Sequence, residues 1–542
     1  MSDVAAYLDT ARAHHNAGRL DDAQASYRRV LATAPDDATA LHLLGVVCHQ
    51  RGDSQQACTL IAQACQREPD NAEFARNFAL VLSVLDRRPE ATAQLQRALR
   101  LEPENVQARL QLASVHHQGG AIREALRHYQ LALEAVPDLA DLHNQIGVCH
   151  LQLDDLASAL DAFSACLQRD PQHGDARENL GRALLRGKRF DEAQAHLDAL
   201  LADQPLRDEA SHLLGFVRLH QGHLQDASQH FLTPVRRRFA VGSDGGASPA
   251  DASVVTRTKL VNDIQQLEYL ESIGAAPTQQ VTPLLAPYRA ALAALPAETR
   301  DRFFFDAPPV AGFSEVFNRL HVEKQAPQVD TAAVSLTLDH ERIESTFQRD
   351  GWAVIDDFLS AEALAALRRF CNESTIWFEK KFRNEVGASL RNGFCCPALL
   401  QVAEETRMAF PDLLAEHLFT GCFSYKYFGV ETEGNVHADR GAISLNLWIT
   451  PDAANLDPQR GGLLIWNKRV PSNYFDCSPQ EIDHIHEQMV SAADARPSII
   501  AYRSNRAMLF RSDVLHKSDR MHFAPDYENR RVSLTFLYGH PG

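Results

Sequence analysis

The sequence predicts a multidomain chain, in which an all-α array of helical repeats is followed by a domain built mostly of β-strands. Two observations lead to this fold class. Proline recurs with a constant step of 34 residues through the first half of the chain, at Pro35, Pro69, Pro103, Pro137, Pro171 and Pro205. From Trp352 onward, short runs of β-branched and aromatic residues separated by turn residues replace the helical pattern. At 542 residues the chain is long enough for two or more domains, each with its own core.

Three further kinds of position keep the same register as the prolines. Alanine occupies the first kind, at Ala23, Ala57, Ala91, Ala125, Ala159, Ala193 and Ala227. A small residue precedes each alanine by twelve, at Ala11, Gly45, Ala79, Ala113, Gly147, Gly181 and Gly215. A bulky residue follows each alanine by four, at Tyr27, Ile61, Leu95, Tyr129, Phe163, Leu197 and Phe231. Small residues let two helices of a hairpin approach closely, bulky residues pack between hairpins, and proline ends the second helix.

A period of 34 with these positions resembles the tetratricopeptide repeat. The resemblance covers residues 4 to 236 and implies seven helical hairpins stacked into a right-handed superhelix, so the first domain is expected over residues 1–236. It also implies a concave groove that binds an extended peptide or a partner helix. A spacer or a dimerisation arm is the alternative role for the array.

Residues 237–334 read as a linker with bridging helices. Small, polar and turn-prone residues over 241–252 predict a flexible loop. Helical periodicity then predicts one helix from Val254 to Ile273 and a second from Val281 to Leu295, which cap the superhelix or brace it against the next domain. The aromatic run Phe303 to Phe305 predicts an anchored loop, because three successive aromatic residues are rarely left in water.

The last domain is expected over residues 335–542. Its first strand is predicted at Trp352–Phe358, followed by a helix that Ser360 caps and that runs through Leu367. Further strands are predicted at 423–428, 442–449, 461–466, 498–502, 506–511 and 531–538. Seven or eight short strands, with helices only at the start, are typical of a closed or jelly-roll barrel.

Composition and charge limit the classes of partner. The formal net charge of −16 argues against nucleic acid, because phosphate binding needs clustered positive charge. The basic run Arg236-Arg237-Arg238 reads as a solvated helix end. No apolar run approaches the roughly 20 residues of a membrane span, and the start of the chain lacks the pattern of a signal peptide. Ten scattered cysteines without a CxxC pair are typical of buried thiols in a reducing cytoplasm.

One triplet of the second half, His437-Ala438-Asp439, lies between two strand-like runs. In an extended chain, residues i and i+2 share a face, so both side chains can meet one ion. His516 is a third candidate ligand. Two imidazoles and one carboxylate make a facial triad that holds iron(II) and leaves positions open for a cosubstrate and dioxygen. The triplets His173-Gly174-Asp175 and His196-Leu197-Asp198 match the same pattern, but both fall inside helical repeats, where residues two apart diverge by about 200°.

The order of motifs around this triplet resembles the Fe(II)/2-oxoglutarate-dependent dioxygenases with a double-stranded β-helix, of the prolyl hydroxylase and phytanoyl-CoA hydroxylase kind. The resemblance covers about residues 339 to 538. Its parts are the opening 351–359 with the helix after it, His437-Ala438-Asp439, Gly461-Gly462-Leu463, 505–510, His516 and Arg531-Val532-Ser533. It implies that His437, Asp439 and His516 bind iron(II) as the catalytic centre, with 2-oxoglutarate and dioxygen as cosubstrates.

The far carboxylate of 2-oxoglutarate needs a cation and a hydroxyl in a desolvated slot. Arg531 can bind it through two nitrogens, and Ser533 on the same strand face can donate one more hydrogen bond. Arg530 points to the opposite face of a regular strand, so Arg531 is favoured over it, although a long insertion after His516 leaves both open. Asn446, a polar residue between aliphatic neighbours, is a further contact or a cross-strand partner. Tyr427 reaches the cosubstrate or packs in the core.

These patterns predict an iron- and 2-oxoglutarate-dependent hydroxylase acting on a protein or peptide that the repeats recruit. Two alternatives stay open. In the first, the substrate is a small molecule and the repeats are a docking arm. In the second, the chain is a scaffold without catalysis. The sequence does not identify the substrate, the hydroxylated atom or the oligomeric state.

Overall fold

The computed structural model describes residues 2–239, 254–296, 303–304, 312–324, 326–380, 384–428, 434–491 and 496–540. The chain forms two compact units, Met1–His196 and Leu197–Gly542. The segment 241–252, expected as a flexible loop, lies outside the described residues, and so does Phe305. The domain boundaries expected after residues 236 and 334 were inferred from sequence motifs, and they stay predictions.

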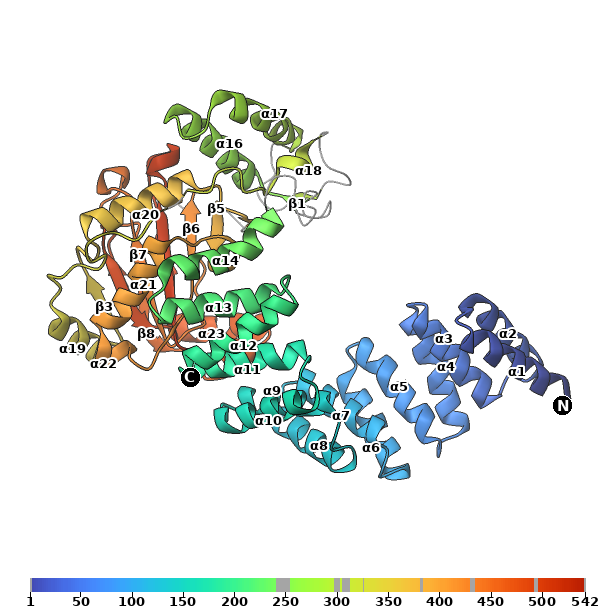
Figure 1. Ribbon diagram of the computed structural model, residues 1–542. Helices are drawn as coiled ribbons and strands as arrows, with labels where there is room; N and C mark the ends of the chain where they lie inside the picture. The colour runs from blue at the N-terminus through green and yellow to red at the C-terminus, as the bar shows by residue number, and fades with distance from the viewer. Residues whose placement is uncertain are drawn as a thin grey trace. The chain divides into compact units, whose positions relative to one another are not determined.

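The described part of the first 239 residues is entirely helical (Figure 1). Its helices are α1 (Ser2–Asn16), α2 (Leu20–Thr33), α3 (Ala38–Gln50), α4 (Ser54–Arg67), α5 (Ala72–Val84), α6 (Arg88–Leu101), α7 (Val106–Gln118), α8 (Ile122–Ala135), α9 (Ala140–Gln152), α10 (Leu156–Arg169), α11 (Gly174–Arg186), α12 (Phe190–Asp203), α13 (Asp208–His220) and α14 (Leu224–Phe239). Helices of one repeat pack as a hairpin, α1 with α2 and α3 with α4, and each hairpin of the first unit packs on the next. The predicted helical array is confirmed.

Local capping explains where these helices begin and end. Asp37, Asp53 and Asn71 each accept a hydrogen bond from a backbone N–H in the first turn of the helix that follows. The periodic prolines directly follow the C-cap residues of the second helices, as Pro35 follows Ala34 and Pro69 follows Glu68. The predicted role of proline in ending these helices is therefore confirmed.

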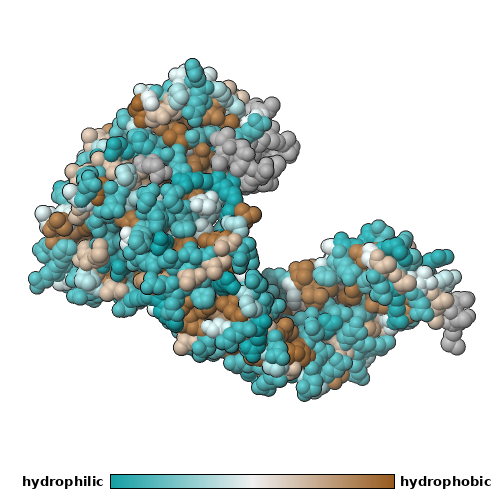
Figure 2. Space-filling view, viewed as in Figure 1, coloured by the Kyte–Doolittle hydropathy of each residue, from teal (hydrophilic) through white to brown (hydrophobic). Residues whose placement is uncertain are grey.

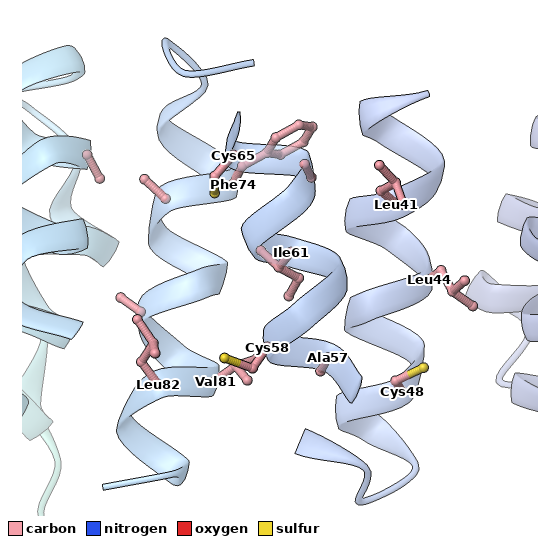
Figure 3. Close-up of a cluster of buried hydrophobic side chains, with 14 of the residues drawn as sticks. Leu41, Leu44, Cys48, Ala57, Cys58, Ile61, Cys65, Phe74, Val81 and Leu82 are labelled. Carbon is pink, nitrogen blue, oxygen red and sulfur yellow. The ribbon is translucent and has the colours of Figure 1, made fainter. Parts of the chain in front are cut away.

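Small and bulky positions meet inside the hairpins. Ile61 lies on α4, between α3 and α5, and its side chain is fully buried (Figure 3). A Cβ atom added to Gly45 would lie 2.5 Å from Ile61 Cγ1, and one added to Gly147 would lie 2.5 Å from the ring of Phe163. Glycine is needed at these positions because a side chain there would collide with the bulky residue. Hydrophilic residues cover most of the visible face of these helices (Figure 2).

The last repeat hairpin, α13 and α14, belongs to the second unit and shares its core. Both helices contact α21 (Pro397–Ala409). Phe239 at the end of α14 stacks on Phe378 with ring centroids 4.1 Å apart. Arg236 Nε donates to a Glu323 carboxylate oxygen at 2.8 Å. The last hairpin is thus packed into the second half of the chain.

The bridging segment contains β1 (Val254–Val255), α16 (Arg257–Ser272), α17 (Thr278–Ala294), β2 (Phe303–Phe304) and α18 (Phe313–Val316). The first expected helix begins three residues late, because Val254 and Val255 pair with Phe304 and Phe303 as a two-stranded sheet. The second expected helix begins three residues early, at Thr278. Gln266 of α16 donates to the carbonyl oxygens of Asn372 and Ser374, so α16 braces the strand-rich region.

The strand-rich region holds ten described strands and several helices. The strands are β3 (Trp352–Ile355), β4 (Glu379–Lys380), β5 (Glu385–Ser389), β6 (Phe419–Tyr427), β7 (Ile443–Trp448), β8 (Leu463–Arg469), β9 (Ser498–Ile500), β10 (Ala507–Arg511), β11 (Val514–Ser518) and β12 (Val532–Tyr538). The helices are α19 (His340–Asp350), α20 (Ala361–Glu373), α21, α22 (Pro411–Leu414) and α23 (Pro479–Ser491), with short 3₁₀ turns at 390–392, 452–454, 474–476 and 527–529. Helices therefore occur throughout this half, and the expectation of helices only at its start is wrong.

The strands form two antiparallel sheets. Seven strands follow the order β3-β10-β7-β12-β6-β5-β4, and three follow the order β11-β8-β9. One hydrophobic cluster joins the sheets: it combines Trp448, Met508 and Phe510 of the larger sheet with Leu463 and Ile465 of the smaller. The shared cluster defines an inner face for each sheet. Within the described residues, no helix is long and apolar enough to cross a membrane.

Candidate metal centre

His437, Asp439 and His516 meet at one end of the inner faces. His437 and His516 pair as an isolated antiparallel bridge, with N–O distances of 2.9 and 3.0 Å between their backbones. Asp439 N donates to the carbonyl oxygen of Ser512 at 2.9 Å, which fixes the third residue. The ligating atoms of the three side chains all lie within 4.8 Å of one another. The structure brings the three predicted ligands together, close enough to share one ion.

Each imidazole is oriented by a backbone carbonyl. His437 Nδ1 lies 2.9 Å from the carbonyl oxygen of Asn435, and His516 Nδ1 lies 3.0 Å from that of Val514. A carbonyl oxygen only accepts, so each Nδ1 atom carries a proton, and a neutral ring then keeps its lone pair on Nε2. Each Nε2 atom lies 3.8 Å from a different carboxylate oxygen of Asp439. This is the arrangement that metal-binding histidines need.

One buried serine binds the Asp439 carboxylate, and a second buried serine contacts the first. Ser444 Oγ donates to Asp439 Oδ2 at 2.8 Å, and the Ser512 hydroxyl lies 2.8 Å from Ser444 Oγ. Both serines are fully buried. One carboxylate oxygen is therefore engaged by a hydroxyl, which leaves Oδ1 for an ion.

Burial differs across the site. His516 is almost fully buried, whereas nearly half of the His437 side chain is exposed. Burial lowers the pKa of His516 to about 4, and the neighbouring His437 acts in the same direction while the Asp439 carboxylate opposes both. His516 is therefore neutral at neutral pH, the form that binds a metal ion. Access to the site is from the side of His437.

The two other His-x-Asp triplets, at residues 173–175 and 196–198, do not form a group of metal-ligating side chains within the described residues. His173 is the N-cap of α11, where its ring accepts from Ala176 N, and it bonds Asp141 at 2.7 Å rather than Asp175. It lies within the helical repeats, as expected, at the start of α11. His196 lies within α12, as expected. His437, Asp439 and His516 are the one group of three metal-ligating side chains among the described residues.

Arg531 is buried beside the glycine pair that precedes β8. Its Nε donates to the carbonyl oxygen of Gly461 at 2.8 Å and its Nη2 to that of Gly462 at 3.3 Å, while Nη1 has no hydrogen-bond partner. It is 1 % exposed, and among the described residues no carboxylate pairs with it. Gly461 adopts φ +85°, and a Cβ on Gly462 would lie 1.9 Å from the Ile500 carbonyl oxygen, so only glycines can present these carbonyls.

Arg530 lies on the other side of the strand. Its Nη2 donates to Gln265 Oε1 of α16, and its guanidinium lies 3.7 Å from the centroid of the Phe428 ring. The two arginines therefore face opposite ways, as a strand requires. Of the two, Arg531 is the one in the interior.

The remaining predicted contacts line the same inner face. Tyr427 lies under the Arg531 guanidinium, 4.9 Å from ring centroid to Cζ, and its hydroxyl is 3.3 Å from Ser518 Oγ. Burial raises the pKa of Tyr427, so its hydroxyl stays protonated. Ser533 pairs with Tyr425 on β6 and with Trp448 on β7. Sequence reasoning assigned no role to Trp448, although its spacing of two from Asn446 puts it on this face.

Asn446 makes a cross-strand hydrogen bond. Its Nδ2 donates to Thr535 Oγ1 at 3.1 Å, and its Oδ1 is buried without a partner. The cross-strand role that the sequence left open is therefore present. The free oxygen leaves room for a second contact.

Comparisons with known proteins bear on the repeats. A family model described as tetratricopeptide repeat matches residues 8–72, 77–140 and 122–173, and a second model with the same description matches residues 150–215. The N-terminal part of this chain therefore carries tetratricopeptide repeats, as the sequence predicts. No curated protein sequence matches the chain.

Several solved structures are similar to the chain. A tetratricopeptide repeat protein from Parabacteroides merdae has 15% identity over 43% of this chain and 93% of that chain, with a TM-score of 0.37. The protein pilF of Pseudomonas aeruginosa has 19% identity over 38% and 94%, with a TM-score of 0.34. YrrB, described as a TPR protein with an unusual peptide-binding site, has 21% identity over 32% and 90%, with a TM-score of 0.29.

Proposed function

We propose that this protein is an Fe(II)- and 2-oxoglutarate-dependent oxygenase that hydroxylates an unactivated C–H bond of a protein or peptide bound by the repeats. One observation carries the proposal. Two imidazoles and one carboxylate converge within 4.8 Å at one end of an inner face, and a buried guanidinium without a carboxylate partner lies on the same face. The proposal also takes the two antiparallel sheets as a double-stranded β-helix.

The donor set fits iron(II). Two neutral imidazoles and one carboxylate bind this ion and leave open positions beside it. The orientation of both rings by carbonyls, and of Asp439 by Ser444, fixes the donors before an ion arrives. When bound, iron(II) would supply the dioxygen chemistry that couples hydroxylation to conversion of 2-oxoglutarate into succinate and carbon dioxide.

Arg531 would hold the distal carboxylate of 2-oxoglutarate. Its guanidinium is anchored by the Gly461 and Gly462 carbonyls and keeps Nη1 for a ligand. An unpaired buried cation is costly, and a carboxylate from the cosubstrate would remove that cost. Tyr427 and Ser533 line the same place and add hydroxyls. The apolar cluster around Trp448 borders this place, and a slot closed to water would strengthen the ion pair.

The repeats support a macromolecular substrate. Tetratricopeptide repeats serve as protein-binding arrays, and an enzyme tethered to its substrate gains effective concentration without new contacts at the active site. A scaffold without catalysis is the second candidate, favoured by the repeats themselves. A small-molecule substrate, with the repeats as a docking arm, is the third.

Succinate formation tests the proposal. The full chain, prepared without oxygen, receives Fe(II) and 2-oxoglutarate before oxygen is admitted. We expect succinate from the unmodified protein, none from His437→Ala, and an unchanged rate from His173→Ala, which alters a matching triplet in the repeats. Absence of both succinate and iron binding would favour the scaffold. Stimulation of turnover by peptides rather than by metabolites would favour the macromolecular substrate.

A further inference from the structure

The segment between β8 and β9 packs on the outer side of the metal-binding triplet. It contains the 3₁₀ turn that begins at Tyr474, and it contains α23. Tyr474 is 4 % exposed and belongs to one hydrophobic cluster with Ala438 and Leu515. Ala438 lies between two of the proposed ligands, and Leu515 directly precedes the third. Because side chains alternate along an extended chain, this cluster packs on the face opposite to the ligands.

The Tyr474 hydroxyl also binds the backbone of the triplet. The N–H groups of the residues on either side of Ala438 donate to carbonyl oxygens of the neighbouring segment 512–516, so the Ala438 N–H points the other way. Burial raises the pKa of Tyr474, and a hydrogen bond with the Ala438 backbone opposes this rise. A bond that lowers the pKa of a hydroxyl is donated to its oxygen, so the Ala438 N–H is the donor. The triplet is therefore hydrogen-bonded along both edges.

Helix α23 orients the Tyr474 hydroxyl. The hydroxyl lies 2.8 Å from His486 Nε2, and the two ring centroids lie 5.7 Å apart. Burial lowers the pKa of His486, the Asp483 carboxylate opposes this, and His437 adds to it, so the ring is neutral at neutral pH. A buried hydroxyl proton needs an acceptor, and a neutral imidazole supplies one. A chain of contacts therefore runs from α23 through Tyr474 to the triplet.

A second histidine of α23 provides a matched control. His484 is exposed, and its Nε2 lies 2.7 Å from Nε2 of Gln488 on the same helix. Residues two apart on a helix diverge by about 200°, so His484 and His486 point in different directions. Substitution of His484 therefore changes the same helix and the same residue type without touching the contact to Tyr474.

We infer that Tyr474 is a positioning residue of the metal centre, and that α23 holds it in place through His486. The inference rests on the proposed function, of which it uses only the metal centre. The hydroxyl restrains the peptide groups on either side of Ala438, and these groups carry His437 and Asp439. Both donors are then aimed at one point before an ion arrives. Without the hydroxyl, ordering the triplet would cost part of the free energy of metal binding.

Metal titration tests the inference without turnover. The full chain, prepared without metal, is titrated with Mn(II), which stands in for iron(II). We expect Tyr474→Phe to raise the Kd for Mn(II) about tenfold, because partners that orient ligating groups contribute at least this much to affinity. His486→Leu should raise the Kd as well, and His486→Gln should recover most of the affinity, because an amide oxygen can accept the same proton. His484→Leu should leave the Kd unchanged.

A merely structural role for Tyr474 predicts a different result. Tyr474→Phe keeps the buried ring and removes only the hydroxyl. If the hydroxyl served stability alone, the urea midpoint of the metal-free protein would fall, and the folded variant would bind Mn(II) as tightly as the unmodified protein. We expect the Kd to rise instead, and the EPR spectrum of bound Mn(II), which reports the symmetry of its ligands, to change with it.

The outcomes separate the inference from the proposed function. If the unmodified protein binds no Mn(II), the metal centre fails, and the inference with it. If it binds Mn(II) and Tyr474→Phe binds equally well, only the inference fails. Binding of Mn(II) without succinate formation by the iron-loaded protein would reject the oxygenase and leave the positioning role in place. Should Tyr474→Phe not fold, His486→Leu decides, because every residue of α23 is at least partly exposed; an unchanged Kd in that variant would overturn the inference.

Discussion

Ser444 Oγ donates a hydrogen bond of 2.8 Å to Asp439 Oδ2. Through this contact a residue of strand β7 holds the carboxylate of a residue that lies before the strand. Asp439 lies before β7, and Ser444 is the second residue of β7. Because Oδ2 is engaged, Oδ1 is the oxygen expected to bind an ion. Asp439 would then bind the ion through one oxygen only, which would leave other coordination positions of the ion open.

Removing this support should weaken metal binding. Ser444→Ala is expected to raise the Kd for Mn(II) about tenfold to hundredfold, because partners of ligating groups contribute this much to affinity. Calorimetric titration of the full chain measures the effect. Ser424→Ala is the control, since Ser424 is equally buried and donates to the Ser533 carbonyl oxygen instead. Equal affinities of the Ser444 variant and the unmodified protein would contradict the supporting role.

Loss of the interior guanidinium should abolish stabilisation by 2-oxoglutarate. A ligand that binds only the folded state raises Tm, and the rise depends on its Kd. With Mn(II) present, 2-oxoglutarate is expected to raise the Tm of the unmodified protein and not that of Arg531→Gln. Arg530→Gln, which alters the arginine that faces α16, should keep the rise. An undiminished rise in Arg531→Gln would exclude Arg531 as the carboxylate anchor.

Acid should destabilise the second unit through His212. This side chain is buried between Phe216 and Phe231, and burial lowers its pKa to about 4, with Arg391 acting in the same direction. Between about pH 6.5 and pH 4 the unfolded chain binds the proton and the folded chain does not, so stability is present above this window and is lost as the pH falls through it. The full effect is roughly 3 kcal/mol.

The variant His212→Leu isolates this contribution. Its urea midpoint is expected to fall less than that of the unmodified protein between pH 6.5 and pH 4. His484→Leu, which changes an exposed histidine of α23, should follow the unmodified protein. Parallel pH profiles of His212→Leu and the unmodified protein would show that His212 does not set the acid sensitivity.

Gly147 should tolerate alanine only when its partner Phe163 is made smaller, because the Phe163 ring already fills the space beside Gly147. Gly147→Ala brings a Cβ to 2.5 Å from Phe163 and is expected to destabilise α9 and α10 by about 1–2 kcal/mol, despite the better helix propensity of alanine. Hydrogen exchange of these helices measures the loss. Adding Phe163→Leu should restore protection, because Ala79 and Leu95 occupy the same two repeat positions in an earlier repeat and belong to one buried cluster there. Failure of the second change to restore it would point to another cause.

Sequence periodicity predicted the repeats well because each position recurs and each contact is local. The convergence of the three proposed metal ligands was also predictable, since His437 and Asp439 are two residues apart in extended sequence and His516 follows in order. Other elements left no periodic signal. Helix α21 is buried on nearly every face from Pro397 to Ala403, so it shows no amphipathic stripe. Strand β11 was missed because it is short and ends in Lys517 and Ser518.

Hydrogen bonds between residues far apart in the chain could not be predicted from the sequence. Ser512 reaches Ser444 across 68 positions, and Arg531 reaches the Gly461 carbonyl oxygen across 70. Such pairs depend on the order of strands in the two sheets, which no local pattern encodes. That the Trp448 indole N–H is buried without a hydrogen-bond partner can be recognised only from the folded structure.

The seventh hairpin limits how this protein can be recombined. Its side chains already contact the strand-rich half. Phe239 stacks on Phe378, the ring centroids of Phe216 and Phe419 lie 6.1 Å apart, and Glu209 forms an ion pair with Arg391. Grafting a foreign recognition arm onto the strand-rich half would therefore succeed only if the junction lay upstream of α13. The same contacts hold this hairpin in place, so under the proposed function the sequence changes that alter partner binding would be confined to the hairpins before it.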